Sequence, residues 1–67
     1  MKNGILRVDE GYSIYVDGKE RTFRDRHEIA ILSAAILKQR NPKSLIEVLD
    51  RSTGSRYPVS AEGRMGQ

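Results

Sequence analysis

The chain has 67 residues, with 12 Lys and Arg against nine Asp and Glu, one His, and neither Cys nor Trp. A chain of this length forms one small domain or less, with a modest core. The lack of cysteine excludes disulfide bridges, thiolate chemistry and a cysteine-ligated zinc finger. The formal net charge of +3 is mild for a nucleic-acid-binding protein.

Two short strand patterns open the chain. Residues 5–9 are rich in apolar and β-branched side chains, and residues 12–16 alternate with the period of two that is typical of a strand. Only Glu10 and Gly11 separate them, which predicts a tight hairpin.

The next turn signal leaves two alternatives open. Asp17-Gly18 is the strongest short turn signal of the sequence. It closes a further hairpin with residues 19–23, or it bends one long strand. Phe23 is expected to cover the start of the helix that follows.

A helix is predicted over residues 26–40, which contain no Gly or Pro and have apolar residues at helical spacing. Asp25 suits the N-cap, and Glu28 three residues later completes a near capping box. Asn41-Pro42 ends the helix, because the residue before a proline is driven out of the helical region.

A second hairpin follows. Residues 45–49 and 56–59 read as strands, and residues 50–55 have the composition of a turn. Pro58 lacks an N–H donor, so its strand is expected at a sheet edge. Residues 60–67 are polar and aperiodic, which predicts a flexible C-terminal tail.

These elements predict an α+β fold. Residues 1–59 form a single ββαββ domain, a two-layer sandwich in which two hairpins make one antiparallel sheet with the helix packed on one face. The side chains expected to face the sheet from the helix are Ile29, Leu32, Ser33, Ile36 and Leu37. Ile31, Ala34 and Ala35 then point away from this stripe.

The opposite face of the predicted sheet is more apolar than a solvated face should be, which favours a protein interface there. The candidate interface residues are Ile5, Arg7, Tyr15, Leu45 and Leu49. Two simpler interpretations stay open: a few apolar side chains are exposed in any protein, or the strand register differs and the two faces swap.

Basic residues gather before the helix, after it and around the last turn, and eight of the twelve are Arg, which suits phosphate contact and stacking. The candidate nucleic-acid contacts are Arg21, Arg24, Arg26, Lys38, Arg40, Lys43, Arg51 and Arg56. Tyr side chains offer stacking platforms. A solvated surface of mixed charge is the alternative, because acidic residues interleave with the first cluster.

The sequence does not favour catalysis. His27 is the only histidine and is expected on the surface, no serine lies in a nucleophile elbow, and glycine-rich phosphate loops are absent. No cluster of metal ligands and no cofactor motif is found.

The longest mostly apolar stretch, residues 29–37, is about half the ~20 residues that a membrane span needs, and no signal peptide is evident. We expect a cytoplasmic protein without a membrane partner.

A further comparison concerns residues 11–19, 23–30, 41–42, 46–48 and 50–54. The layout of these segments resembles that of a family of small bacterial domains of unknown function. The resemblance covers about residues 5 to 59. It implies a hairpin, an alanine-rich helix and a second hairpin closed by an Asp/Gly turn, and it implies no activity and no site residues.

The sequence therefore predicts a non-catalytic interaction module that self-associates or binds another protein through the open sheet face. The alternative is an accessory protein that binds nucleic acid through its arginine clusters and exposed tyrosines.

Overall fold

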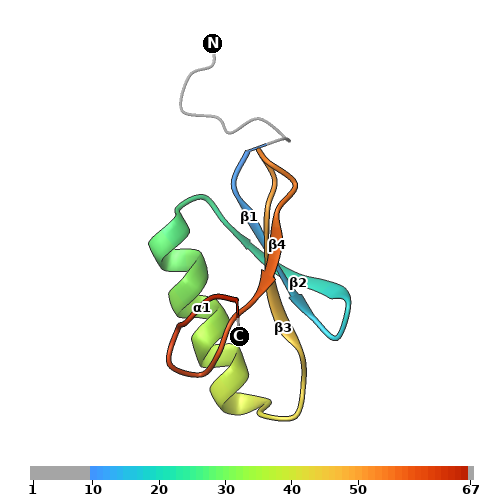
Figure 1. Cartoon of the computed structure of the whole chain (residues 1–67), viewed down its shortest axis with the longest axis vertical. Coiled ribbons are helices and arrows are strands. Elements are labelled where there is room, and N and C mark those ends of the chain that lie inside the picture. The colour runs from blue at the N-terminus through green and yellow to red at the C-terminus, as the bar shows by residue number, and fades with distance from the viewer. Residues whose placement is uncertain (1–9, 67) are drawn as a thin grey trace.

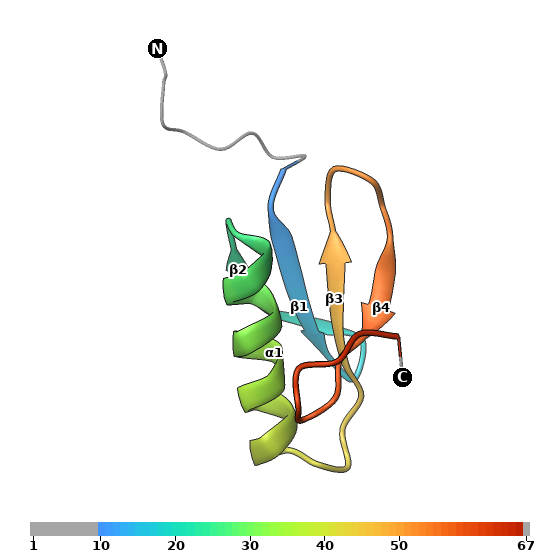
Figure 2. The same cartoon turned by 60° about the vertical axis from the view of Figure 1, so that its left-hand side comes forward.

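The computed structural model of the protein describes residues 10–66. The elements in this range, in chain order, are β1 (Tyr12–Val16), β2 (Lys19–Arg24), α1 (His27–Arg40), β3 (Ile46–Asp50) and β4 (Arg56–Pro58). The strands form one antiparallel sheet in the order β2-β1-β3-β4. The helix lies on one side of this sheet (Figures 1 and 2). The predicted two-layer ββαββ arrangement is confirmed.

The first hairpin joins β1 to β2 through Asp17 and Gly18. Their φ angles are 52° and 86°, and two positive φ angles are what a two-residue type I′ turn requires. Of the two alternatives for this turn, the hairpin is the correct one. The other predicted hairpin needs residues 5–9, which lie outside the described residues. Both edges of β1 are occupied by β2 and β3.

Asp17 also fastens the first hairpin to the connection that leads into β3. Its backbone N–H donates to the carbonyl of Leu45, and its Oδ1 accepts from the backbone N–H of Leu45, both over 2.9 Å. The Leu45 N–H and the Ser44 hydroxyl, helped by the charge of Lys38, lower the pKa of the Asp17 carboxyl below its ordinary value of 3.8.

The helix begins one residue later than its capping signal suggests. Arg26 is the N-cap and makes no side-chain capping bond, so the prediction of Asp25 in that role is wrong. The C-terminal end agrees with the prediction. Asn41 donates from its backbone N–H (2.8 Å) and from its Nδ2 (3.0 Å) to the carbonyl of Leu37, directly before Pro42.

Small side chains form the buried face of α1. Ala30 and Ala34 are fully buried and Ala35 is 5% exposed. Ala30 and Ala34 complete a core with Ile14, Ile46, Val48 and Val59 of the sheet side. The predicted inward stripe is wrong: Ile29, Leu32 and Ile36 are 42%, 63% and 42% exposed. Of that stripe, only Leu37 packs against the core. An alanine surface allows the helix backbone to approach the sheet closely, and the bulky residues then face outward.

The second hairpin agrees with the sequence. β3 and β4 pair antiparallel, and Pro58 lies in the edge strand β4, as its missing N–H donor predicts. In the connecting turn, the Asp50 carboxylate accepts from the Ser52 backbone N–H (3.0 Å) and hydroxyl (2.7 Å). Gly54 has a φ of 80°.

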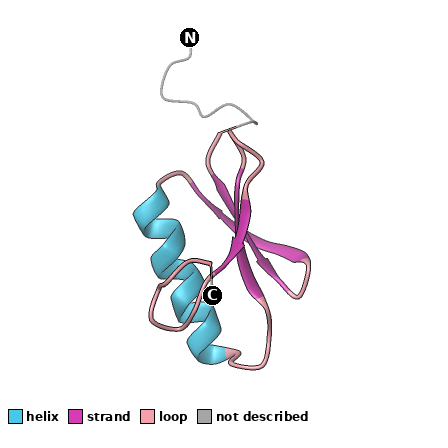
Figure 3. Ribbon diagram, in the orientation of Figure 1, coloured by secondary structure: helices cyan, strands magenta, loops and turns pink. Residues whose placement is uncertain are grey.

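The sequence predicts a flexible tail over residues 60–67; in the structure, residues 60–66 form a hydrogen-bonded loop. Val59 is buried, and its N–H donates to the carbonyl of Ile46 over 2.9 Å. The Gly66 N–H returns to the carbonyl of Pro58 (2.9 Å), and Gln39 of α1 donates to the carbonyl of Ala61 (2.9 Å). The loop therefore lies against α1, where Figure 3 shows it in front of the helix.

Gly11 is the glycine whose replacement should disturb the fold most. Its φ is 93°, and a Cβ at this position would overlap ring carbons Cζ and Cε1 of Phe23. Gly54 has a similar φ of 80° but nothing within 4 Å of its Cβ position. Gly54→Ala should therefore cost about 1–2 kcal/mol for the left-handed backbone alone. Gly11→Ala should cost about 1–3 kcal/mol more, because the Phe23 ring must move.

Urea denaturation of both variants measures this difference in the free energy of unfolding. Adding Phe23→Leu should shrink the gap between the Gly11 and Gly54 variants. Equal losses in the two single variants would contradict the packing of Phe23 on Gly11.

Asp17 should make the protein acid-sensitive. Because its pKa is lowered on folding, its contribution to stability is present above the unfolded value of about 3.8 and is lost as the pH falls through the lower folded value. Asp17→Asn keeps a residue that tolerates positive φ and removes the charge. The urea midpoint of this variant should fall less than that of the wild type between pH 5 and pH 3. If the urea midpoints of the variant and the wild type fell equally between pH 5 and pH 3, the contact of Asp17 with Leu45 would have no electrostatic contribution.

Candidate functional site

The outward face of α1 carries three large apolar side chains, which we call the outward stripe: Ile29, Leu32 and Ile36. Their spacing of three and four residues places them on one side of the helix, opposite the buried alanines. Leu32, at 63% exposure, is the most exposed large apolar side chain of the described residues. Between Ile29 and Leu37 apolar residues lie on every side of α1, and an exposed apolar face of this kind is typical of an interaction surface.

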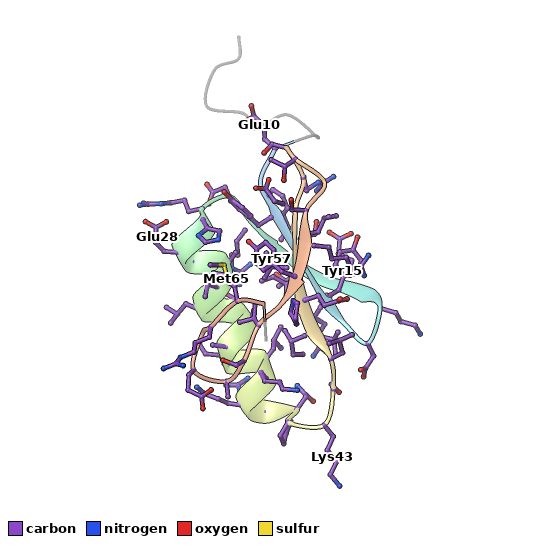
Figure 4. The ribbon with its side chains drawn as sticks, viewed as in Figure 1. Glu10, Tyr15, Glu28, Lys43, Tyr57 and Met65 are labelled. Atoms are coloured by element: carbon purple, nitrogen blue, oxygen red, sulfur yellow. The ribbon has the colours of Figure 1, made fainter. Side chains whose placement is uncertain are left out.

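Charges of opposite sign lie at the two ends of the outward stripe. At the N-terminal end, Asp25 and Glu28 outweigh Arg26, whose Nη2 lies 3.6 Å from Glu28 Oε2. The backbone N–H of Glu28 and the neighbouring Arg26 lower the pKa of the Glu28 carboxyl. Arg40 and Lys43 lie at the C-terminal end, and Figure 4 places Glu28 and Lys43 at opposite ends of the helix.

On the open face of the sheet, arginines cover two aromatic rings. The guanidinium of Arg56 lies 4.1 Å from the ring centroid of Tyr15, and that of Arg51 lies 5.3 Å from the centroid of Phe23. Arg56 Nε also donates to Glu47 Oε1 over 3.2 Å. Phe23 pairs with Ser13 on this face, so the prediction that it covers the helix start is wrong.

The predicted protein-interface residues fall into three groups. Ile5 and Arg7 lie outside the described residues. Tyr15 and Leu49 are half-buried and share the open face, on which Tyr15 points away from α1 (Figure 4). Leu45 precedes β3 and is 49% exposed.

The predicted nucleic-acid contacts are spread over separate places. Arg21 and Arg24 belong to β2, and Arg26 precedes α1. Arg40 and Lys43 lie near the C-terminal end of α1, where Lys38 instead donates from Nζ to the carbonyl of Ser44 over 2.6 Å. Arg51 and Arg56 cover the open sheet face.

His27 is half-buried between two tyrosines rather than solvated as predicted. Its Nε2 lies 3.1 Å from Tyr57 Oη, and its ring meets Tyr12 edge-on at 5.3 Å between centroids. Burial, and then the charge of Asp50 and the nearby Tyr12, raise the pKa of Tyr57. In residues 10–66, no group of three His, Asp or Glu side chains is placed to hold a metal ion. The arrangement explains His27 as a packed, hydrogen-bonded residue.

Two grooves run along the sides of α1. The one between α1 and β2, here called the β2 groove, has a volume of about 300 Å³. It is lined by Arg21, Thr22, Arg24, Ser33, Ile36 and Leu37. The second, of about 820 Å³, lies between α1 and the C-terminal loop and includes Leu32, Gln39 and Ala61. Sequence patterns did not reveal either groove, because each joins elements that are distant in the chain.

Residues 10–66 contain no helix with the length and apolar character of a membrane span. No family model matches the chain, and searches of the curated proteins and of the solved structures found no similar protein. The resemblance to small bacterial domains of unknown function therefore stays a prediction.

Proposed function

We propose that the protein is a non-catalytic interaction module that self-associates through the outward stripe of α1. The observation that carries this proposal is the exposure of Ile29, Leu32 and Ile36 at the centre of the helix face turned to solvent. The sheet face predicted from sequence suits this role less, because Arg56 and Arg51 cover Tyr15 and Phe23 there.

Burial of the outward stripe would supply a substantial driving force. Fully burying a Leu or Ile side chain contributes about 1.5–3 kcal/mol, and in a symmetric pair each copy buries the same residues. Side chains that are already half-covered contribute less than this range. Three such residues on each copy form a small apolar centre with a charged rim, which is the usual anatomy of a protein interface.

The charges at the ends of α1 favour an antiparallel pair of helices. Reversing one copy brings its acidic end, with Asp25 and Glu28, against the basic end of the other, with Arg40 and Lys43. It also opposes the two helix dipoles. A parallel pair would place like charges together at both ends.

Sedimentation velocity of two matched variants tests the proposal. Leu32→Glu and Leu45→Glu make the same chemical change at exposed leucines, one on the outward stripe and one before β3. We expect the wild type and Leu45→Glu to form dimers as concentration rises, and Leu32→Glu to stay monomeric because two buried carboxylates would meet. Leu and Glu have similar helix propensity, so circular dichroism should show an intact helix.

Three results would contradict the proposal. The wild type would remain monomeric at millimolar concentration, or Leu32→Glu would dimerise as well as the wild type. If Leu45→Glu were monomeric and Leu32→Glu still dimerised, the interface would lie in the region before β3.

Binding of single-stranded nucleic acid on the open sheet face is the second candidate. The specific observation in its favour is that two arginines lie over two aromatic rings of the same face, Arg56 on Tyr15 and Arg51 on Phe23. Bases stack on both aromatic rings and guanidinium planes. Arg56 is already paired with Glu47, which weakens this candidate relative to the first.

A labelled single-stranded oligonucleotide, titrated at two salt concentrations, tests the second candidate. If phosphate contacts form, affinity should fall steeply as salt rises. The double variant Arg51→Gln and Arg56→Gln should weaken binding about tenfold or more, since each arginine offers charge-assisted hydrogen bonds. Absence of binding at low salt would rule this candidate out.

A further inference from the structure

The two edge strands of the sheet differ in what lies beside them. The outer edge of β4 carries Pro58, and the carbonyl of that residue accepts from Gly66 of the C-terminal loop over 2.9 Å. The outer edge of β2 pairs with no strand among residues 10–66. Three residues of β2 itself, Arg21, Thr22 and Arg24, line the β2 groove, so a segment lying beside β2 would lie next to it.

A β-bulge turns an extra basic residue toward the groove. In the β1–β2 register Ile14 pairs with Thr22 and Tyr15 with Glu20, which leaves Arg21 as the inserted residue of β2. Bulges redirect side chains in this way at strand edges and next to binding sites. As a result, Arg21 lines the groove together with Thr22 and Arg24.

The Arg24 guanidinium is held in place and keeps donors to spare. Its Nη1 donates to Thr22 Oγ1 and to the carbonyl of Phe23, both over 2.8 Å. A guanidinium carries five N–H donors, so Nη2 and Nε retain theirs. Within residues 10–66, neither Arg21 nor Arg24 forms an ion pair, whereas Arg26 and Arg56 do. Two guanidinium groups without acidic partners form a fitting site for a carboxylate, and a fixed geometry lowers the cost of binding it.

Apolar side chains line the groove beside the arginines. Ile36, 42% exposed, and the half-buried Leu37 contribute its apolar surface, and Ser33 is a further lining residue. The volume of about 300 Å³ lies at the lower end for ligand pockets. A groove of this volume has room for only a few side chains of a longer ligand.

From these features we infer that the β2 groove binds an extended acidic segment of a partner protein. The segment places a carboxylate on Arg21 and Arg24 and a neighbouring apolar side chain on Ile36 and Leu37. The positive charge of β2, with Lys19, Arg21 and Arg24 against Glu20, disfavours a second copy of the same strand and selects acidic partners.

This site overlaps the proposed dimer surface at Ile36, while its arginines lie outside that surface. Peptide binding is therefore measured in the Leu32→Glu variant as well as in the wild type. Peptide binding to both proteins would show that the groove binds its ligand whether or not the protein self-associates.

Fluorescence anisotropy with a labelled peptide tests the inference. The probe has Thr at every second position and alternating Glu and Val between them, so that one face offers carboxylates and apolar groups together. The first control peptide replaces Glu with Gln, and the second replaces Glu with Lys. We expect the Glu peptide to bind, and the Gln and Lys peptides to bind at least about tenfold more weakly, because each loses charge-assisted hydrogen bonds.

Variants of the protein locate the site. Arg21→Gln changes an exposed side chain with no hydrogen bond among the described residues and should weaken binding several-fold. Adding Arg24→Gln should bring the loss to about tenfold or more. Arg64→Gln, which makes the same change in the C-terminal loop, should leave the affinity unchanged.

The inference would be overturned if the Glu peptide failed to bind, if the Gln peptide bound equally well, or if Arg21→Gln and Arg64→Gln had the same effect. Stronger binding of a single-stranded oligonucleotide than of the Glu peptide, lost with Arg21→Gln, would assign the groove to phosphates and would equally overturn it.

Discussion

Close contact between two alanines of α1 and the sheet governs the rest of this structure. Ala30 and Ala34 are fully buried against the core that Ile14 and Val48 supply from β1 and β3. A methyl group contributes little apolar area, but it lets the helix axis come near the strands and exclude water from between them. The helix is therefore oriented by its smallest apolar residues.

This orientation determines which surfaces remain for binding. Once the alanine side faces the sheet, the outward stripe must face solvent, and Leu32 becomes its most exposed member. The same rotation places Ser33 and Ile36 beside β2, where they line a groove with Arg21 and Arg24. The large apolar side chains that a core could have used therefore lie at the surface.

Arginine has different roles at different positions of the fold. Arg51 and Arg56 cover aromatic rings on the open sheet face and so reduce its apolar exposure. Arg24 is held by Thr22 and by the carbonyl of Phe23 next to a groove. Composition counts all of these residues alike, yet the neighbouring side chains decide whether a guanidinium is used for packing or is free to bind a ligand.

Local signals in the sequence determined the order of elements: the Asp17-Gly18 turn, the helix end at Asn41-Pro42 and the edge position of Pro58 each follow from backbone constraints of one or two residues. The buried side of α1 was not determined in this way. Its apolar residues surround the helix, so periodicity favoured the large Ile and Leu side chains over alanine.

Contacts between distant segments produce three further features of the structure. These are the β2 groove, the folded loop of residues 60–66 and the position of His27 between Tyr12 and Tyr57. Only tertiary packing fixes such contacts, because it selects one helix face by close fit to the sheet rather than by hydrophobicity alone.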